Sequence, residues 1–128
     1  MRISINTPVG FNDVGGRANQ EDAIYPGMNQ LSVGNRVFVV CDGLGGLPRG
    51  EVASETVARA LGEWMERNAA SEWPVTEGNV REAVRYAQSK LDEVSRYYSS
   101  VESMGTTMTM LALGSGSSCI AAAGISGG

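Results

Sequence analysis

The most informative stretch of the chain reads Val37-Phe-Val-Val-Cys-Asp-Gly-Leu-Gly-Gly46. Its first five residues are apolar and rich in valine, which predicts a buried strand over 36–41. A carboxylate and then glycines follow, and glycine lets a backbone approach a ligand closely. We therefore expect the strand to deliver Asp42 to a surface that binds a metal ion or a phosphate. An ordinary Asp-Gly turn at the strand end is the alternative interpretation.

Composition limits the class of protein. The 128 residues are enough for one domain, 1–128, and 42% hydrophobic with 19% charged residues is typical of a globular protein. The net charge is −4 and no cluster of Lys or Arg occurs, which argues against nucleic acid as a partner. The sequence has no apolar run of membrane-spanning length and no signal-peptide pattern, so we expect a cytoplasmic protein without a membrane partner.

The residue types also limit the kind of metal that could bind. The chain contains no histidine, which removes the commonest general acid or base and the commonest transition-metal ligand. Cys41 and Cys119 lie in apolar stretches without the spacing of a zinc site, and we expect them to be reduced, buried thiols. Any bound metal should therefore be a hard cation held by oxygen atoms.

The flanking segments alternate between strand-like and helix-like patterns. We expect strands at 2–6, 23–25, 36–41, 105–113 and 119–123, the last two forming a hairpin around 114–118. A helix should begin after the loop that ends at Gly50, because apolar residues recur at helical spacing from Val52 to Met65. A second helix should begin near Asn79, capped with the help of Glu82, and continue to Tyr98. This order predicts an α+β fold, an antiparallel sheet with an antiparallel helix pair on one face.

Three segments together resemble a known family. They are Arg17-Ala-Asn-Gln-Glu-Asp-Ala23, the Asp42 loop with Gly50-Glu-Val-Ala-Ser54, and Met104-Gly-Thr-Thr-Met-Thr-Met-Leu111. In order and spacing they resemble the N-terminal half of the type 2C (PPM) metal-dependent Ser/Thr protein phosphatases. The resemblance covers nearly the whole chain but only part of the family's catalytic domain, an α-β-β-α sandwich. It implies that the expected sheet and helix pair are half of that sandwich.

The resemblance also implies a chemistry and a set of site residues. In the family, two Mg²⁺ or Mn²⁺ ions hold a water that attacks the phosphorus of phosphoserine or phosphothreonine in a protein substrate. By motif, Asp42 would bridge the two ions and the carbonyl of Gly43 would bind one of them. Glu21 and Asp22 would hold metal-bound waters. Arg17 would bind the substrate phosphate.

The chain departs from the family pattern in its ligand set. The other metal-binding aspartates belong to C-terminal motifs that this sequence does not contain, and Ile125 stands where the family carries a further aspartate. No histidine follows the glycine loop. Two functions therefore remain open, a Mg²⁺- or Mn²⁺-dependent Ser/Thr protein phosphatase and a non-catalytic binding module of the same fold. The site residues have corresponding alternative interpretations. Glu21 and Asp22 could form a solvated acidic corner, and Arg17 could be a surface salt-bridge partner.

A nucleotide-binding loop is a further alternative. Gly43-Leu-Gly-Gly-Leu-Pro48 imitates the GxGxxG pattern that follows a strand in dinucleotide-binding domains. Proline occupies the third glycine position, and the carboxylate of Asp42 would repel a pyrophosphate. We therefore favour the metal site over the phosphate cradle.

The last strands carry an expectation about assembly. The segment 107–113 changes from alternating to continuously apolar, which is typical of a strand buried on both faces. Helices on one face of the sheet leave the other face to be covered. We therefore predict a homodimer that packs sheet on sheet.

Overall fold

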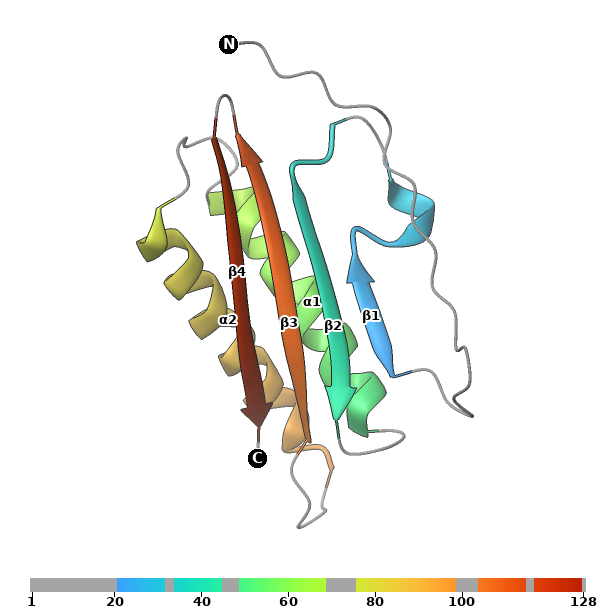
Figure 1. The fold of residues 1–128 in the computed structure, drawn as a ribbon. Coiled ribbons are helices and arrows are strands. Elements are labelled where there is room, and N and C mark those ends of the chain that lie inside the picture. Colours follow the sequence, from blue (N-terminus) through green and yellow to red (C-terminus); the bar gives the residue numbers. More distant parts are fainter. Residues whose placement is uncertain are drawn as a thin grey trace.

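The computed structural model describes residues 21–31, 34–44, 49–68, 76–98, 104–114 and 117–127. In this part of the chain four antiparallel strands form one sheet in the order β1-β2-β3-β4, and two helices cover one face of it (Figure 1). The elements are β1 (Asp22–Tyr25), the 3₁₀ helix η1 (Met28–Gln30), β2 (Val37–Leu44), α1 (Arg49–Asn68), α2 (Glu77–Ser95), β3 (Met104–Gly114) and β4 (Ser117–Gly127). The predicted α+β fold and the β3–β4 hairpin are confirmed. The strand expected at 2–6 lies outside the described residues.

Strand β2 is longer than its apolar run. It continues through Asp42, Gly43 and Leu44, because these residues pair with Thr107, Thr106 and Gly105 of β3. The sequence pattern suggested that the chain leaves the sheet after residue 41. Pairing with a strand distant in sequence instead keeps the backbone of these residues in the sheet. The interpretation of Asp42-Gly43 as a strand-ending turn is wrong.

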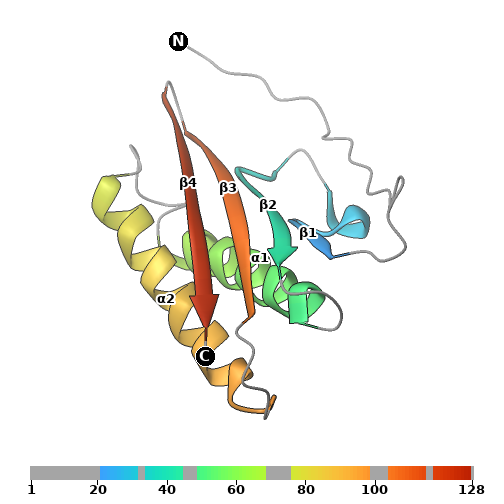
Figure 2. The ribbon, with the colours of Figure 1, turned by 60° about the horizontal axis from the view of Figure 1, so that its bottom comes forward.

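The two helices lie antiparallel on the same face of the sheet, as Figures 1 and 2 show. The apolar stripe predicted for α1 is buried at Ala53, Val57, Ala60, Leu61 and Met65. In α2 only Ala83, Ala87 and Leu91 are fully buried. Helix α1 therefore contributes more of the core, because it also packs against β1, β2 and β3.

Both helices begin earlier than the sequence suggested. Helix α1 starts at Arg49 and includes Gly50. Helix α2 starts at Glu77, since Thr76 is the N-cap: its Oγ1 accepts from the Asn79 amide at 3.1 Å, and Asn79 Oδ1 accepts from the Thr76 amide at 2.9 Å. Asn79 therefore completes the capping box as its third residue and does not start the helix.

The core lies between the helices and one face of the sheet. This face, here called the helix face, presents buried side chains from every strand; they include Ala23, Val37, Val39, Cys41, Met104, Met108, Met110, Ala112 and Ile125. Edge strand β1 is fastened to α1 by Tyr25, whose ring packs directly on Gly62 and leaves no room for a Cβ there. Burial, a side-chain hydrogen bond to Glu66 and the nearby negative charges raise the pKa of Tyr25 well above its usual range.

The opposite face of the sheet, here called the open face, has a different character. Val40, Leu44 and Ile120 are exposed on it at 55%, 55% and 73%. Thr107 and Thr109 are also exposed, so the expectation that strand 107–113 is buried on both faces is wrong for the described residues. The helices supply cover for only one side of this strand.

No helix in the described segments has both the length and the apolar character that crossing a membrane requires.

Candidate metal centre

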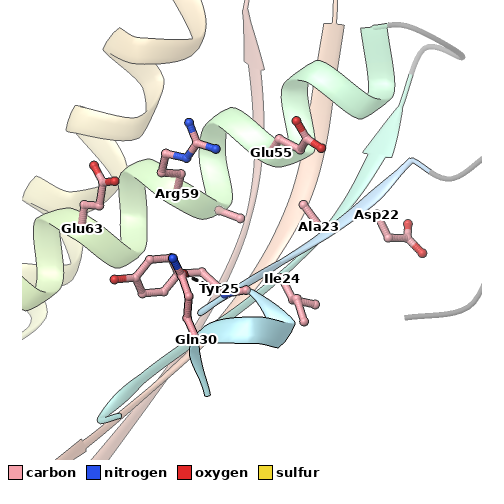
Figure 3. Close-up of a pocket in the computed structure, with 10 residues that line it drawn as sticks. Asp22, Ala23, Ile24, Tyr25, Gln30, Glu55, Arg59 and Glu63 are labelled. Atoms are coloured by element: carbon pink, nitrogen blue, oxygen red, sulfur yellow. Dashed lines mark hydrogen bonds between the residues drawn. The ribbon is translucent and has the colours of Figure 1, made fainter. Parts of the chain in front are cut away.

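Asp22 and Asp42 face each other across β1 and β2, where they are Cα partners in the antiparallel register. Directly opposed residues project from the same face of a sheet, and because Ala23 and Cys41 point to the core, both aspartates belong to the open face. Figure 3 shows the Asp22 carboxylate directed away from α1. Two like charges directly opposite each other repel, so a cation bound between them would be stabilised.

Glu21 approaches the same corner from the start of β1. Its backbone carbonyl accepts a hydrogen bond of 3.0 Å from the Gly43 amide. Its side chain lies on the first turn of α1, where a Cβ on Gly50 would collide with Glu21 Oε1. This oxygen is buried and has no hydrogen-bond partner in the described part of the chain. A buried acceptor without a hydrogen-bond partner costs about 1–3 kcal/mol of stability. A metal-bound water that donates to Glu21 Oε1 would remove this cost.

Gly43 is held where no other residue fits. A Cβ at this position would collide with the carbonyl oxygen of Gly50 and lie 2.5 Å from the carbonyl oxygen of Glu21. Both neighbours are backbone atoms and cannot rotate away. The absence of a side chain thus lets β1, β2 and the start of α1 meet beside Asp42.

Thr106 supports the same peptide from the core side. Its buried hydroxyl lies 3.0 Å from the carbonyl oxygen of Asp42 and 2.8 Å from that of Thr107. The sequence predicts a strand at 105–113 but not this contact, because only the register of β2 on β3 reveals it. The signal present in the sequence was the hydroxyl in a strand that is otherwise apolar on its core side.

Cys41, next to Asp42, is fully buried on the helix face and points away from the corner. Burial raises the pKa of its thiol to about 12, although a side-chain hydrogen bond with Thr106 acts in the opposite direction. A thiol that stays protonated at neutral pH is a poor nucleophile. Its place is in the core, as the sequence predicted.

The donors fit part of a hard-cation site. Asp42, Asp22, Glu21 and the Gly43 carbonyl offer oxygen atoms only, which suits Mg²⁺ or Mn²⁺. Among the residues that the structure describes, however, no three Asp, Glu, Cys or His side chains converge closely enough to hold an ion. Mg²⁺ prefers near-ideal octahedral geometry, so this corner provides some of the required oxygen atoms and would need water or further ligands for the rest. Arg17 lies outside the described residues.

A cavity of about 400 Å³ borders this corner at Asp22, which belongs to both. It opens between the edge strand and α1 and is lined by Tyr25, Gln30, Glu55, Arg59 and Glu63, among others (Figure 3). Asp42 and Gly43 do not line it. The cavity and the carboxylate corner therefore adjoin through Asp22 and are otherwise made of different residues.

The family follows from a comparison with known sequences. The family model "Protein phosphatase 2C" matches residues 14–126, nearly the whole chain. The chain belongs to the protein phosphatase 2C family. A search of curated proteins finds no significant match.

Solved structures agree with this placement. The PPM Ser-Thr phosphatase MsPP from Mycobacterium smegmatis, in complex with cacodylate, has a TM-score of 0.59 and 23% identity, over 94% of this chain and 43% of that one. The Mycobacterium tuberculosis serine/threonine phosphatase PstP/Ppp has a TM-score of 0.58 and 29% identity, over 84% of this chain and 40% of that one. The catalytic domain of PstP in complex with 2 manganese ions has a TM-score of 0.56 and 29% identity, over 85% of this chain and 41% of that one. The chain thus spans about two fifths of the length of these structures and matches the N-terminal part of their catalytic domain.

Proposed function

We propose that the chain is part of a Mg²⁺- or Mn²⁺-dependent protein phosphatase that removes phosphate from phosphoserine or phosphothreonine in proteins. The observation that carries the proposal is the register of β1 on β2, which opposes Asp22 and Asp42 beside the side-chain-free Gly43. Membership of the protein phosphatase 2C family supports it, as does the binding of 2 manganese ions by the related PstP domain.

Each residue of the corner has a proposed role. Asp42 and the carbonyl of Gly43 would hold the ions, and Glu21 and Asp22 would orient metal-bound waters. Arg17 would bind the phosphate of the substrate through its two-pronged guanidinium group. The bound ions would supply a water activated for attack on phosphorus.

The proposed activity has a direct test. With p-nitrophenyl phosphate or a phosphothreonine peptide, we expect turnover only when Mn²⁺ or Mg²⁺ is added, and very low turnover, because the described residues offer only part of a ligand shell. Arg17→Ala should raise KM for the phosphopeptide and leave Mn²⁺ affinity unchanged. Robust turnover in excess EDTA would contradict the proposed chemistry.

A non-catalytic binding module is the second candidate function. The observation that favours it is the incomplete donor set in the described residues. Such a module would bind a phosphopeptide or a partner protein without releasing phosphate. Phosphopeptide binding that is measurable by calorimetry, together with no phosphate release at saturating Mn²⁺, would decide for it.

We also propose that two copies of the chain associate through the open face. Exposed apolar side chains at Val40, Leu44 and Ile120 support a sheet-on-sheet contact. Light scattering should then give a mass that rises from monomer to dimer with concentration. A monomer at high concentration that binds no hydrophobic dye would contradict this partner.

The remaining proposals concern the chain as a whole. We propose that residues 1–128 form a single, partial phosphatase domain, and that it works in the cytoplasm. The two free cysteines, Cys41 and Cys119, support a reducing compartment.

A further inference from the structure

The peptide unit between Asp42 and Gly43 is held from both sides. On the β1 side, the Gly43 amide donates to the carbonyl of Glu21 at 3.0 Å. On the β3 side, the carbonyl of Asp42 lies 3.0 Å from the hydroxyl of Thr106. This peptide unit links the Cα atoms of Asp42 and Gly43, the residues that carry the two proposed oxygen donors, so a shift of the peptide would move both.

The Thr106 hydroxyl differs from the other fully buried hydroxyl of the described core. Ser54 donates to the carbonyl of Glu51, three residues away within α1. Thr106 reaches a carbonyl 64 residues away in sequence, and it also lies 2.8 Å from the Thr107 carbonyl. Asp42 and Thr107 are partners in register, so the single proton of this hydroxyl lies between the carbonyls of a facing pair on two strands and is shared by them.

A hydroxyl in an apolar core needs a reason, because valine has nearly the same shape and requires no hydrogen bond. The neighbours of Thr106 on the core face are Met104 and Met108, two residues away on the same strand, and the thiol of Cys41, with which its hydroxyl forms a hydrogen bond. Packing alone therefore gives no preference for threonine at this position. The hydrogen-bond partners of the hydroxyl do, and among them only the Asp42 carbonyl belongs to the peptide that carries the proposed metal donors.

We propose that Thr106 is a positioning residue, whose hydroxyl fixes the Asp42–Gly43 peptide and thereby aims the two oxygen donors of the proposed metal centre. This role rests on the proposed function for its metal-binding consequence. Its structural part, the restraint on the peptide, stands independently. Thr106 does not touch metal or substrate and acts only through Asp42 and Gly43.

The experiment compares Thr106→Val, which keeps the shape, with Thr106→Ser, which keeps the hydroxyl. Ser54→Ala is the matched control, since it removes the other buried hydroxyl of the core. Hydrogen exchange of the Gly43 amide, taken relative to the Val39 amide of the same strand, reports the restraint without any metal. Calorimetric titration with MnCl₂ reports its consequence.

We expect the relative exchange of the Gly43 amide to rise about five- to tenfold in Thr106→Val, the effect of losing one hydrogen bond. Mn²⁺ affinity should fall about threefold or more, and Thr106→Ser should restore both values. Ser54→Ala should leave both unchanged. If Thr106→Val does not fold, Thr106→Ala against Thr106→Ser gives the same comparison.

An unchanged Gly43 exchange in the hydroxyl-free variant, or a failure of Thr106→Ser to restore it, would overturn the inference. Raised and restorable exchange in a protein that binds no Mn²⁺ in any form would keep the restraint and remove its role in a metal site. That outcome would count against the proposed function. The two failures are thus distinguishable.

Discussion

The two faces of the sheet are made by the same four strands and have opposite roles. On the helix face, β2 and β3 contribute buried residues such as Val39, Cys41 and Met108, all at most 2% exposed. On the open face, the alternate residues of these strands include Asp42, Thr107 and Val40, which are exposed. Burial of apolar area on the helix face provides the stability that allows the open face to hold opposed carboxylates.

The open face is itself divided along the strands. Asp22, Asp42 and Thr107 are paired in one row, and exposed apolar residues of β2 lie on both sides of it, Val40 before Asp42 and Leu44 after it. The charged row suits a cation, whereas the apolar residues beside it suit another protein surface. Successive residues of one strand point to opposite faces of the sheet. A single strand can therefore place residues for the core and residues for a binding site at alternate positions.

The largest expected effect is on the helix face. Leu61→Ala in α1 should lower the free energy of unfolding by about 3 kcal/mol, because Leu61 is fully buried and its truncation leaves a cavity. Ile120→Ala on the open face, where the side chain is 73% exposed, should change it by less than about 0.5 kcal/mol. Urea denaturation measures both. An equal loss in the two variants at low protein concentration would remove the contrast between the faces.

The next effect concerns Gly43, where β1, β2 and the start of α1 meet. Gly43→Ala should destabilise by about 1–3 kcal/mol, because the new Cβ meets backbone oxygens that cannot move aside. Gly124→Ala is the control, since a Cβ there meets nothing within 4 Å. Thermal unfolding should show a clear fall in Tm for the first variant and none for the second. The same Tm in both would mean that Gly43 is not tightly enclosed.

A smaller effect concerns the stability of the fold at high pH, through the buried Cys41 of the helix face. Burial raises the pKa of Cys41 to about 12, so the folded state keeps a proton that the unfolded thiol loses from about pH 9 upward. The free energy of unfolding should therefore fall with rising pH in this window, by at most about 1.4 kcal/mol per pH unit for this group. Cys41→Ala should flatten the slope between pH 9 and 11.

Cys119→Ala is the control for this measurement, because Cys119 is only half-buried. Other groups, Tyr25 among them, titrate in the same range, so the difference between the two slopes is the quantity to compare. Identical slopes in the two variants would show that Cys41 is not protected from ionisation by the fold.

The elements of the fold were predictable where local pattern determines them. The helical spacing from Val52 to Met65 and the apolar run of β2 placed α1 and the central strand. The ends were predicted less well, since they depend on partners: β2 continues to Leu44 because β3 pairs with it, and α2 starts at Glu77 because Thr76 caps it. A hydrogen bond with a distant strand has no local signal in the sequence.

The candidate site was predictable in its residue types but not in its arrangement. The resemblance named Glu21, Asp22, Asp42 and Gly43, and the register adds that the two aspartates face each other. The burial of Glu21 Oε1 and the contact of Thr106 with Asp42 needed the packed structure. Both depend on how β1, β2, β3 and α1 meet, which no single segment encodes. The role of Arg17 stays a prediction.

The central claim is that Asp42 holds a hard cation at the end of β2 without being needed for the fold. Calorimetric titration with MnCl₂ of the wild type, Asp42→Asn and the control Glu82→Gln, an equal loss of charge at an exposed site on α2, tests it directly. We expect weak binding, roughly millimolar, in the wild type and in Glu82→Gln, no binding in Asp42→Asn, and the same Tm within a few degrees in all three. Equal Mn²⁺ affinity in Asp42→Asn and the wild type would contradict the account.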